Sequence, residues 1–485
     1  MKNTFAPINR IPPEVLTLIP DYWEDNSDDR ALIRLTHVCR GWRELFVSRP
    51  SLWTRLDCIH VGKTRAYIER SKTSPLEICL GESNDEVFFA EEALLLAVPH
   101  FGRLGTLSVF GDSIGVLPVF VEHFSCSVPL LSRLEINFVC DEDAVLPNTL
   151  FNGDLSSLHE LELVGVTTAL PWRGLSKLTT FNLYCVPGDN ILLTQLLDFF
   201  ESAPHLRHIK LHDSIPTSRN TPAERVVSLP HLKDFSIISQ PAHSILLNHL
   251  SIPAGASLWL EFTYSGKESP IPSYLPNPLD RLHNISHITT VNLRLASEQR
   301  CVRLSGPSGE LYMVGWWTRS GNKPYDGTRT FLRSLSRFDI SRTQWLTVML
   351  YCHPPSSFPT TEWTIYHTFC SMKNLRTLTL SRCKNLTFIL ALNPSKNPSK
   401  TILCPKLEEI ILYIERPDQF HVDELLSMAK ERASGGVKLP AITIVSTEEF
   451  APTKGVFQLR KHVSRVEYKF DDAPPEWDTL PNEVV

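Results

Sequence analysis

The residues that could carry out covalent chemistry are scattered along this chain, and their spacing fits none of the common catalytic patterns. Gly62-Lys63-Thr64 has the residue types that end a phosphate-binding loop, but Asp57 stands where that loop needs its first glycine. We therefore interpret this tripeptide as the start of an ordinary helix. The nucleophile-elbow, zinc-protease and dinucleotide-binding motifs do not occur in the sequence. We expect a protein that is not an enzyme.

The histidines and cysteines do not have the spacing of metal ligands. His205, His231 and His287 stand in polar positions just before predicted strands, where we expect exposed loop ends. The 11 cysteines are scattered, and no two of them are spaced C-x-x-C. They predict free thiols in a reducing compartment, so we expect a protein of the cytoplasm or nucleus. We expect neither a metal nor a cofactor.

Composition excludes several further classes of function. The chain has 485 residues, 42% of them hydrophobic, which is enough for more than one ordinary domain. Its net charge of −5 offers no basic field for nucleic acid or for an anionic membrane. No window has the roughly 18 apolar residues of a membrane span, and residues 1–10 lack the apolar core of a secretory signal. We expect no nucleic-acid partner and no membrane partner.

The elements that must position any site begin with short helices in residues 10–53. Pro12-Pro13 suits a first helical turn, where the missing N–H groups are not needed. One apolar face follows, made of Ile11, Val15, Leu16 and Ile19. Pro20 should end this helix, and residues 24–29 form an acidic segment that we expect to be a solvated loop.

A second helical pattern follows the acidic segment. Its apolar residues are Ala31, Leu32, Leu35, Val38 and Cys39, continued by Trp42, Leu45 and Phe46. Arg49-Pro50-Ser51 breaks the pattern, and Leu52-Trp53 returns to apolar character. Three short helices in about fifty residues are near the lower limit for an isolated core, so this module should gain stability by packing against another surface.

In order and spacing, this module resembles the F-box family. The residues that carry the resemblance are Ile11-Pro12-Pro13-Glu14-Val15-Leu16 with Ile19, then Leu35, Val38-Cys39-Arg40, Trp42-Arg43 and Leu45, then Pro50 and Leu52-Trp53. The V-C-R-x-W and P-x-L-W pieces are most similar to fungal members. The resemblance implies that these helices bind a Skp-type adaptor, which connects through a cullin to a RING subunit and a ubiquitin-conjugating enzyme.

The resemblance also implies which side chains contact the adaptor. The candidates are Ile11, Pro12, Val15, Leu16, Ile19, Leu35, Val38, Cys39, Trp42 and Leu52. Some of these must instead face the core of the module, and the sequence does not sort them. Pro20 and Trp23 depart from the family pattern, since bulky aliphatic residues usually stand near these places. The alternative interpretation is a generic helical cap on a larger domain.

Beyond residue 76 the sequence changes to short segments with alternating apolar residues. A seven-residue pattern (polar, apolar, polar, polar, apolar, polar, apolar) begins at Arg103, Ser157, Lys177, His205, His231, His287, Ser334, Asn374 and His462. Near-matches begin at Leu130, Ser257, Lys406 and Lys438. From Arg103 to His287, successive starts lie 20 to 30 residues apart. This recurrence of an L-x-x-L-x-L strand resembles the leucine-rich repeat.

The segments between these strands include helical patterns at 91–98, 119–124, 191–203, 364–372 and 422–433. Gly435-Gly436 should end the last of these helices. Strand and helix in alternation predict an α/β fold: a three-helix F-box followed by an irregular leucine-rich-repeat solenoid. The consensus Asn or Cys after each strand is clear only at Cys383, so the turns must be satisfied in another way.

We expect four parts along the chain: an F-box at 1–56, a helical linker that begins the solenoid at 57–100, the solenoid at 101–470 and a tail at 471–485. Residues 264–330 repeat least and could be an insertion or an exposed loop, although Trp316-Trp317 fits a short strand. Residues 392–401 should form a polar loop, and the tail is rich in proline and acidic residues.

These features favour one function over two others. The first is a substrate-receptor subunit of a Skp–cullin–F-box ubiquitin ligase, whose solenoid binds an unknown target protein. Since the F-box begins almost at Met1, target choice should lie behind it. The second is an F-box scaffold or regulator that acts outside a ligase, and the third is an enzyme hidden on an α/β scaffold. Basic residues in the predicted strands could line a concave face, or simply a solvated one: Arg207, Lys210, Lys233, Arg294 and Arg376.

Overall fold

A computed structural model gives the fold of the chain. It describes residues 11–16, 18–19, 29–81, 89–111, 116–138, 145–147, 149–168, 174–185, 192–214, 225–239, 246–264, 275–296, 299–317, 332, 335–350, 361–381, 387–414, 419–446 and 454–470. The expected tail at 471–485 lies outside these ranges. The chain divides into two compact units, Met1–Leu206 and Arg207–Val485, which are described separately below.

The first unit begins with a small group of helices. They are α1 (Pro13–Leu16), α2 (Asp29–Val38), α3 (Arg40–Val47) and a 3-10 turn, η4 (Pro50–Trp53). A parallel sheet follows directly. Its strands are β1 (Arg55–Leu56), β2 (Leu76–Leu80), β3 (Leu104–Gly111), β4 (Arg133–Phe138), β6 (Glu160–Val164) and β8 (Thr180–Tyr184). Each strand pairs in parallel with the next in this order.

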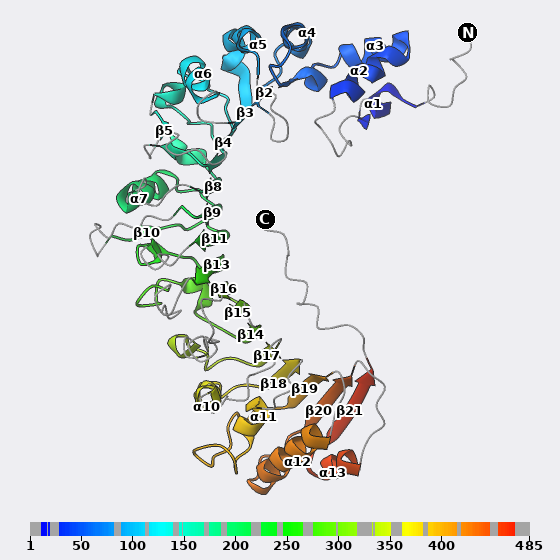
Figure 1. Ribbon diagram of the computed structural model, residues 1–485, viewed down its shortest axis with the longest axis vertical. Helices are drawn as coiled ribbons and strands as arrows, with labels where there is room; N and C mark the ends of the chain where they lie inside the picture. The colour runs from blue at the N-terminus through cyan, green and yellow to red at the C-terminus, as the bar shows by residue number, and fades with distance from the viewer. Residues whose placement is uncertain are drawn as a thin grey trace. The chain divides into compact units, whose positions relative to one another are not determined.

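Helices and short turns connect the strands of the first unit. They are α4 (Val61–Ser71), α5 (Glu91–Ala97), η5 (Val98–Arg103), α6 (Val116–His123), η6 (Leu150–Gly153), η7 (Leu175–Lys177) and α7 (Leu193–Ser202). The strands β5 (Val145–Leu146) and β7 (Thr167–Thr168) form a separate small parallel pair. In Figure 1, α4, α5 and α6 lie along one side of the strands. Alternate strand residues, such as Leu134 and Ile136, are buried, which leaves the opposite face open to solvent.

The second unit contains a longer sheet of the same kind. Its strands are β9 (His208–His212), β11 (Asp234–Ser239), β13 (Ser257–Tyr264), β14 (Thr290–Leu295), β15 (Gln299–Gly306), β16 (Gly309–Trp317), β17 (Trp345–Leu350), β18 (Thr377–Ser381), β19 (Glu409–Ile414), β20 (Ala441–Ser446) and β21 (Arg465–Phe470). The strands lie in the order β9-β11-β13-β16-β15-β14-β17-β18-β19-β20-β21. Among the described strands of this sheet, only β15 runs antiparallel to its neighbours.

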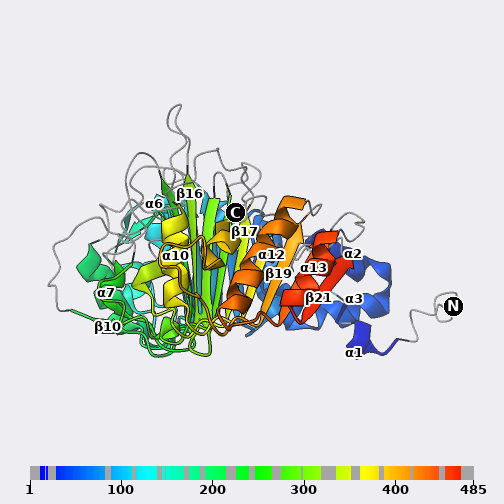
Figure 2. The same ribbon diagram turned by 90° about the horizontal axis from the view of Figure 1, so that it is seen from below.

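The helices of the second unit cover one face of its sheet. They are α10 (Thr361–Ser371), α11 (Thr387–Leu392), α12 (Gln419–Ser434) and α13 (Lys454–His462), with the 3-10 turns η9 (His283–Ile285) and η10 (Leu335–Arg337). Two short strands, β10 (Val227–Ser228) and β12 (Leu250–Ser251), pair beside the main sheet. Figure 2 shows α10, α12 and α13 on the same side of the strands. None of the helices in the described ranges has the length and hydrophobicity needed to cross a membrane.

The seven-residue pattern predicted most of these strands. At Ser157, Lys177, His205, His231, His287, Asn374 and His462 a strand begins three residues after the pattern starts, and the near-matches at Leu130, Lys406 and Lys438 behave in the same way. The three preceding residues form the turn that leads into the strand. The match at Arg103 precedes β3 by one residue, and the near-match at Ser257 is itself the start of β13.

The match at Ser334 was wrong. Leu335–Arg337 forms a 3-10 turn, and the next strand, β17, begins only at Trp345. Leu335 and Phe338 are nonetheless buried, so the apolar positions of the pattern are occupied by a turn that packs inward. Periodicity in a short window reports which residues face the core, and both a strand and a turn can meet that condition.

The stretch 264–330 contains an inserted hairpin. Its strands β15 and β16 lie between β13 and β14, which would otherwise be neighbours. Trp316-Trp317 lies at the end of β16, so the short strand expected there is confirmed. Gly306 and Gly309 stand where the two strands are joined.

All five predicted helices are present, as α5, α6, α7, α10 and α12. The glycine stop after α12 is also confirmed, since Gly436 has a φ of +85° just past the helix end. Residues 393–400 form the expected turns.

Arginine side chains donate hydrogen bonds to turn carbonyls of earlier segments. The buried Arg432 donates from Nη1 to the carbonyl of Leu403 at 2.7 Å and from Nη2 to that of Cys404 at 3.0 Å. The same kind of bond joins Arg337 Nη2 to the carbonyl of Pro276 at 2.7 Å. Arg103 and Arg281 likewise donate to turn carbonyls of an earlier segment. Burial lowers the pKa of Arg432.

The last described strand, β21, pairs with β20 on one side. Charged residues occupy every second position along it: Arg465, Glu467 and Lys469. Glu467 forms ion pairs with both cations, at 3.3 Å from Arg465 and 3.5 Å from Lys469.

Candidate functional site

A compact apolar core holds the N-terminal helices together. Leu16 from α1 packs against Trp42 and Phe46 from α3, and the two aromatic rings meet edge to face with centroids 5.7 Å apart. The half-buried residues around this core are Ile11, Ile19, Leu35, Cys39, Leu45 and Leu52. The apolar faces expected from the sequence therefore do come together.

The second helical pattern is divided into two helices at Cys39. This residue has extended backbone angles, φ −158° and ψ 172°, and its Sγ accepts a bond from Trp42 N at 3.5 Å. Arg43 Nε donates to the carbonyl of Thr36 at 3.0 Å, which satisfies an unpaired carbonyl at the end of α2. The break lets α3 turn its aromatic residues toward α1.

The structure sorts the ten candidate adaptor contacts by their exposure. Leu16 and Trp42 are buried in the core of the module. Ile11, Ile19, Leu35, Cys39 and Leu52 are half-buried against it. Pro12, Val15 and Val38 are exposed, and the exposed fractions of the two valines are 50% and 55%. Only this last group is free to make its main contacts with another protein.

Two further exposed apolar residues were missed by the sequence reasoning. Leu18, which follows α1, is 41% exposed, and Ile33 on α2 is 37% exposed. Ile33 lies beside Arg34 and His37 on the polar side of its helix. An aliphatic residue among polar ones is the sequence signal that could have identified it as an exposed contact residue. Pro20, Trp23 and the acidic segment at 24–28 lie outside the described residues.

A buried tryptophan connects the helical module to the sheet of the first unit. Trp53 Nε1 donates to the carbonyl of Phe46 at 2.9 Å, while its ring meets Tyr67 of α4 edge to face with centroids 5.0 Å apart. The Arg70 guanidinium lies 4.3 Å from the centroid of the same ring. Only Thr54 separates Trp53 from β1, and its carbonyl accepts a bond from Glu77 N of β2 at 3.0 Å.

Gly62-Lys63-Thr64 lies in the first turn of α4, which begins at Val61, so the predicted helix start is confirmed. Lys63 forms an ion pair with Asp57. This lysine is thus engaged by a carboxylate of its own chain.

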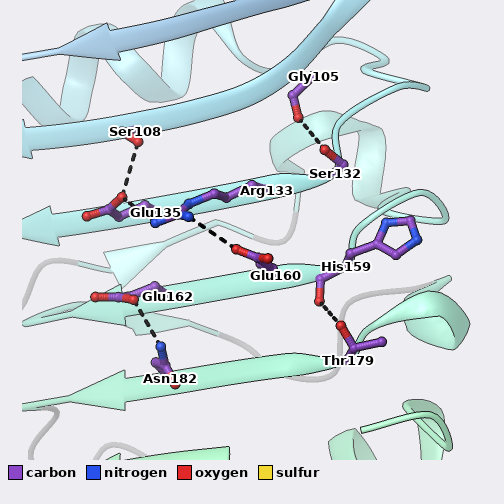
Figure 3. Close-up of polar contacts among 10 residues, drawn as sticks. All are labelled: Gly105, Ser108, Ser132, Arg133, Glu135, His159, Glu160, Glu162, Thr179 and Asn182. Carbon is purple, nitrogen blue, oxygen red and sulfur yellow. Dashed lines mark hydrogen bonds and ion pairs between the residues drawn. The ribbon is translucent and has the colours of Figure 1, made fainter. Parts of the chain in front are cut away.

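The open face of the first unit carries a ladder of polar contacts between strands, drawn in Figure 3. Two in-register rows cross β3, β4, β6 and β8. The first row is Thr106, Arg133, Glu160 and Thr180, and the second is Ser108, Glu135, Glu162 and Asn182. At the start of the strands, the Ser132 and Thr179 hydroxyls donate to the carbonyls of Gly105 and His159.

Charges are distributed unequally between the two rows. In the first row Arg133 forms an ion pair with Glu160 at 3.2 Å. In the second row Glu135 and Glu162 stand directly opposite each other on neighbouring strands. Ser108 Oγ donates to Glu135 at 3.2 Å, and Asn182 Nδ2 donates to Glu162 at 3.0 Å.

The open face of the second unit is more aromatic. Trp259 of β13 packs on Tyr312 of β16 with ring centroids 4.2 Å apart. Both Trp259 and Trp316 donate their indole N–H to Glu261, at 3.4 and 2.6 Å. Tyr312 is nearly buried, whereas Trp316 is 40% exposed.

The described residues hold no group of three or more histidine, cysteine or acidic side chains placed to bind a metal ion. His205, His231 and His287 are exposed, as predicted. Of the predicted basic strand residues, Arg207, Lys210, Lys233 and Arg376 are exposed and Arg294 is half-buried. Burial raises the pKa of the Cys58 thiol to about 12 and that of the Cys301 thiol to about 11.

Comparison with known protein families identifies one domain. A family model described as F-box-like matches residues 8–59. The match covers α1, α2, α3, η4 and β1, the elements that surround Leu16, Trp42 and Trp53. A search of the curated proteins gave no match. The chain therefore contains an F-box-like domain at its N-terminal end.

Proposed function

From the F-box-like domain at residues 8–59, we propose that this protein is the substrate-receptor subunit of a Skp–cullin–F-box type ubiquitin ligase. F-box domains generally bind the Skp adaptor, and a domain of this kind suggests a role as a substrate adaptor. In this proposal the chain catalyses nothing itself. It holds a target near a ubiquitin-conjugating enzyme that arrives through the cullin, so that proximity raises the effective concentration of the reacting groups. It acts in the cytoplasm or nucleus.

The exposed apolar side chains of the helical module support this proposal most directly. Pro12, Val15, Leu18, Ile33 and Val38 remain in solvent although the module has a filled core. Exposed apolar side chains that gather on one small module mark a protein contact, because burying each aliphatic side chain contributes about 1.5–3 kcal/mol. We assign the adaptor contact to this group.

We further propose that the strands and helices behind this module form an irregular leucine-rich-repeat solenoid of the fungal F-box type. The regular offset between pattern and strand, and the parallel pairing in each unit, support this assignment. The open strand faces then bind the target. The arginine bonds to turn carbonyls replace the consensus turn residues of a regular repeat.

Adaptor capture tests the proposal. Val15→Asp with Val38→Asp puts two charges on the exposed group, and we expect binding of purified Skp adaptor to fall at least about tenfold. Val145→Asp is the matched control, since this valine is 56% exposed but lies on β5. Undiminished binding by the double variant would contradict the assignment. Leu16→Asp is unsuitable, because Leu16 belongs to the core and its loss would unfold the module.

Cullin capture separates the two functions that the sequence left open. A substrate receptor retains the cullin when the adaptor is bound, whereas an F-box scaffold outside a ligase retains the adaptor alone. We expect the cullin to be recovered with the wild-type chain and lost with the Val15→Asp, Val38→Asp variant.

A further inference from the structure

We propose that the open face of β3, β4, β6 and β8 docks a basic segment of the target protein, with an arginine or lysine side chain seated between Glu135 and Glu162. This inference rests on the proposed function, since it names the chemistry of the target that the receptor would bind. In Figure 1, α4, α5, α6 and α7 lie on the other side of these strands. Glu160 is 49% exposed and Glu135 is 20% exposed.

The charge on this face is negative and incompletely neutralised. Across the four strands, Glu135, Glu160 and Glu162 face one guanidinium, that of Arg133, which leaves two net negative charges. Arg133 lies 3.2 Å from Glu160 and 3.6 Å from Glu135. In the part of the chain that the structure describes, Glu162 is bonded to the neutral amide of Asn182. A cation from a partner would complete this arrangement.

The register places two carboxylates opposite each other, which destabilises the sheet. Glu135 and Glu162 are direct partners on adjacent parallel strands, whose backbones are about 4.8 Å apart. Like charges directly opposite each other destabilise a sheet. The neutral donors Ser108 and Asn182 flank the pair on the outer strands and hold the carboxylates in place. Fixed carboxylates on neighbouring strands suit a guanidinium, whose N–H groups can reach both.

Apolar and aromatic side chains stand in the next row of the same face. They are Phe110, Val164 and Tyr184, which are half-buried and in register with Asn137. Burial and the nearby Glu162 carboxylate raise the pKa of the Tyr184 hydroxyl, so it stays protonated. An acidic row beside an apolar row matches the charged tip and apolar stem of arginine or lysine.

The aromatic patch around Trp259, Tyr312 and Trp316 in the second unit does not offer the same chemistry. On its open face the exposed Trp316 lies beside Glu261, but Arg303 pairs with Glu310 at 2.7 Å and Arg294 lies in register with Cys301. Two carboxylates and two guanidinium groups leave this patch without net charge. Charge complementarity therefore points to the face of the first unit.

Direct binding to a defined probe tests the proposal in the full chain bound to its adaptor. The probe is a short fluorescein-labelled peptide of alternating glycine and arginine, with peptides that carry glutamine or glutamate in place of arginine for comparison. We expect the arginine peptide alone to bind, with an affinity that falls as salt rises. Absence of binding at low salt would overturn the proposal, as would equal binding of the glutamine peptide.

Two matched variants locate the site. Glu135→Gln with Glu162→Gln removes both charges at nearly constant shape, and we expect the dissociation constant for the arginine peptide to rise about 3- to 10-fold. Glu92→Gln with Glu122→Gln removes the same charge from exposed positions on α5 and α6, on the helical side of the unit, and should leave binding unchanged. An equal loss in both variants would show a bulk charge effect and overturn the site.

Two further measurements on the same samples make the outcome specific. Adaptor binding should be the same in the wild-type chain and in all variants. If the wild-type chain does not bind the adaptor, that result contradicts the proposed function, whereas the peptide measurements test this surface. The Glu135→Gln, Glu162→Gln variant should also melt at a higher temperature, because the opposed carboxylates are gone. The chain could instead self-associate through this face. If that self-association is lost in the Glu135→Gln, Glu162→Gln variant and is not displaced by the arginine peptide, the occupant of the face is a second copy of the chain, and the proposal is overturned.

Discussion

Arg432 is fully buried in the second unit, where its guanidinium bonds two turn carbonyls that precede β19. A buried charge is costly by itself, so the retention of Arg432 reflects the bonds that it makes. The Leu403 carbonyl accepts from the guanidinium, and the Cys404 carbonyl accepts both from the guanidinium and from Leu407 N, the latter at 3.1 Å. The same solution recurs at Arg337. At the residue scale, arginine side chains bond the turn carbonyls of an earlier segment of the chain.

We expect Arg432→Leu to lower the free energy of unfolding by about 1–3 kcal/mol, since it removes the guanidinium donor of the buried Leu403 carbonyl and leaves the Cys404 carbonyl only its bond from Leu407 N. Chemical denaturation followed by tryptophan fluorescence measures this loss. Arg40→Leu is the control, because Arg40 pairs with Glu44 in solvent, with a side chain that is 88% exposed. A stability loss in the control as large as that of Arg432→Leu would contradict the role assigned to the buried guanidinium.

Thiol reactivity should separate the described cysteines by burial. Cys185 is exposed, whereas Cys58, Cys301 and Cys404 are buried. Burial raises the pKa of Cys58 and Cys404 to about 12, so these thiols stay protonated at pH 8 and react slowly. Among the cysteines that the structure describes, we expect iodoacetamide at this pH to label Cys185 first, as measured by peptide mapping.

The same shifts set a direction for stability. A thiol whose pKa is raised by folding stabilises the fold below its unfolded pKa of about 8.5 and loses that contribution as pH rises toward the folded value. The free energy of unfolding should therefore fall as pH increases above about 8.5. Labelling of Cys58 at the rate of Cys185 in the folded chain would contradict the placement of these thiols.

At the element scale, the inserted hairpin β15–β16 depends on two glycines. A Cβ at Gly306 would stand 1.9 Å from the His287 carbonyl oxygen, and one at Gly309 would stand 2.5 Å from that of Ala256. Gly309 also has a φ of +118°, which side chains with a Cβ rarely adopt. The turn can therefore approach the neighbouring strands only because both residues lack a side chain.

We expect Gly306→Ala to destabilise the chain by about 1–3 kcal/mol, because the backbone must move to relieve the clash. Thermal unfolding followed by circular dichroism measures the effect. Gly41→Ala provides the control, since a Cβ at this position of α3 meets nothing within 4 Å. If both alanine variants melt at the wild-type temperature, that result would contradict the role assigned to Gly306.

The elements show how far sequence reasoning reached. The pattern that began at Lys177 or His205 predicted a strand because each strand has one buried face, and burial is what hydrophobic periodicity reports. The same reasoning gave a strand at Ser334, where buried residues belong to a turn. It also missed the pairing of β16 with β13, because pairing depends on hydrogen bonds between distant segments and not on local pattern.

The candidate site was predicted less completely than the fold. The sequence identified the ten apolar residues of the module, but Leu16 and Val15 look alike in a helical pattern although one is buried and the other exposed. The acidic pair Glu135 and Glu162 lies on strands 27 residues apart in sequence, and only the register of β4 and β6 brings the carboxylates together.

At the scale of the whole molecule, the chain divides into two compact units, and the F-box-like domain lies in the first. A partner that binds one unit stabilises only that unit directly. We expect the adaptor, at about 100 times its dissociation constant, to add about 2.7 kcal/mol to the stability of the first unit.

Hydrogen exchange of the full chain, read peptide by peptide, measures this effect. Protection should increase in slowly exchanging peptides of α3, β2 and β3 on adaptor binding, while β18 to β20 in the second unit stay unchanged. Equal added protection in both units would show that they unfold as one cooperative body, against the division described above.

Among the residues that the structure describes, β21 has no strand partner on the side away from β20, which bears on how copies of this chain meet one another. An unpaired edge strand offers N–H and C=O groups to any other edge, and charges along it oppose such pairing. The signs here read plus, minus, plus at Arg465, Glu467 and Lys469, the same in both directions. When two such edges align antiparallel about Glu467, every charge meets its own sign. A symmetric antiparallel dimer through this edge is thus repelled at each charged position.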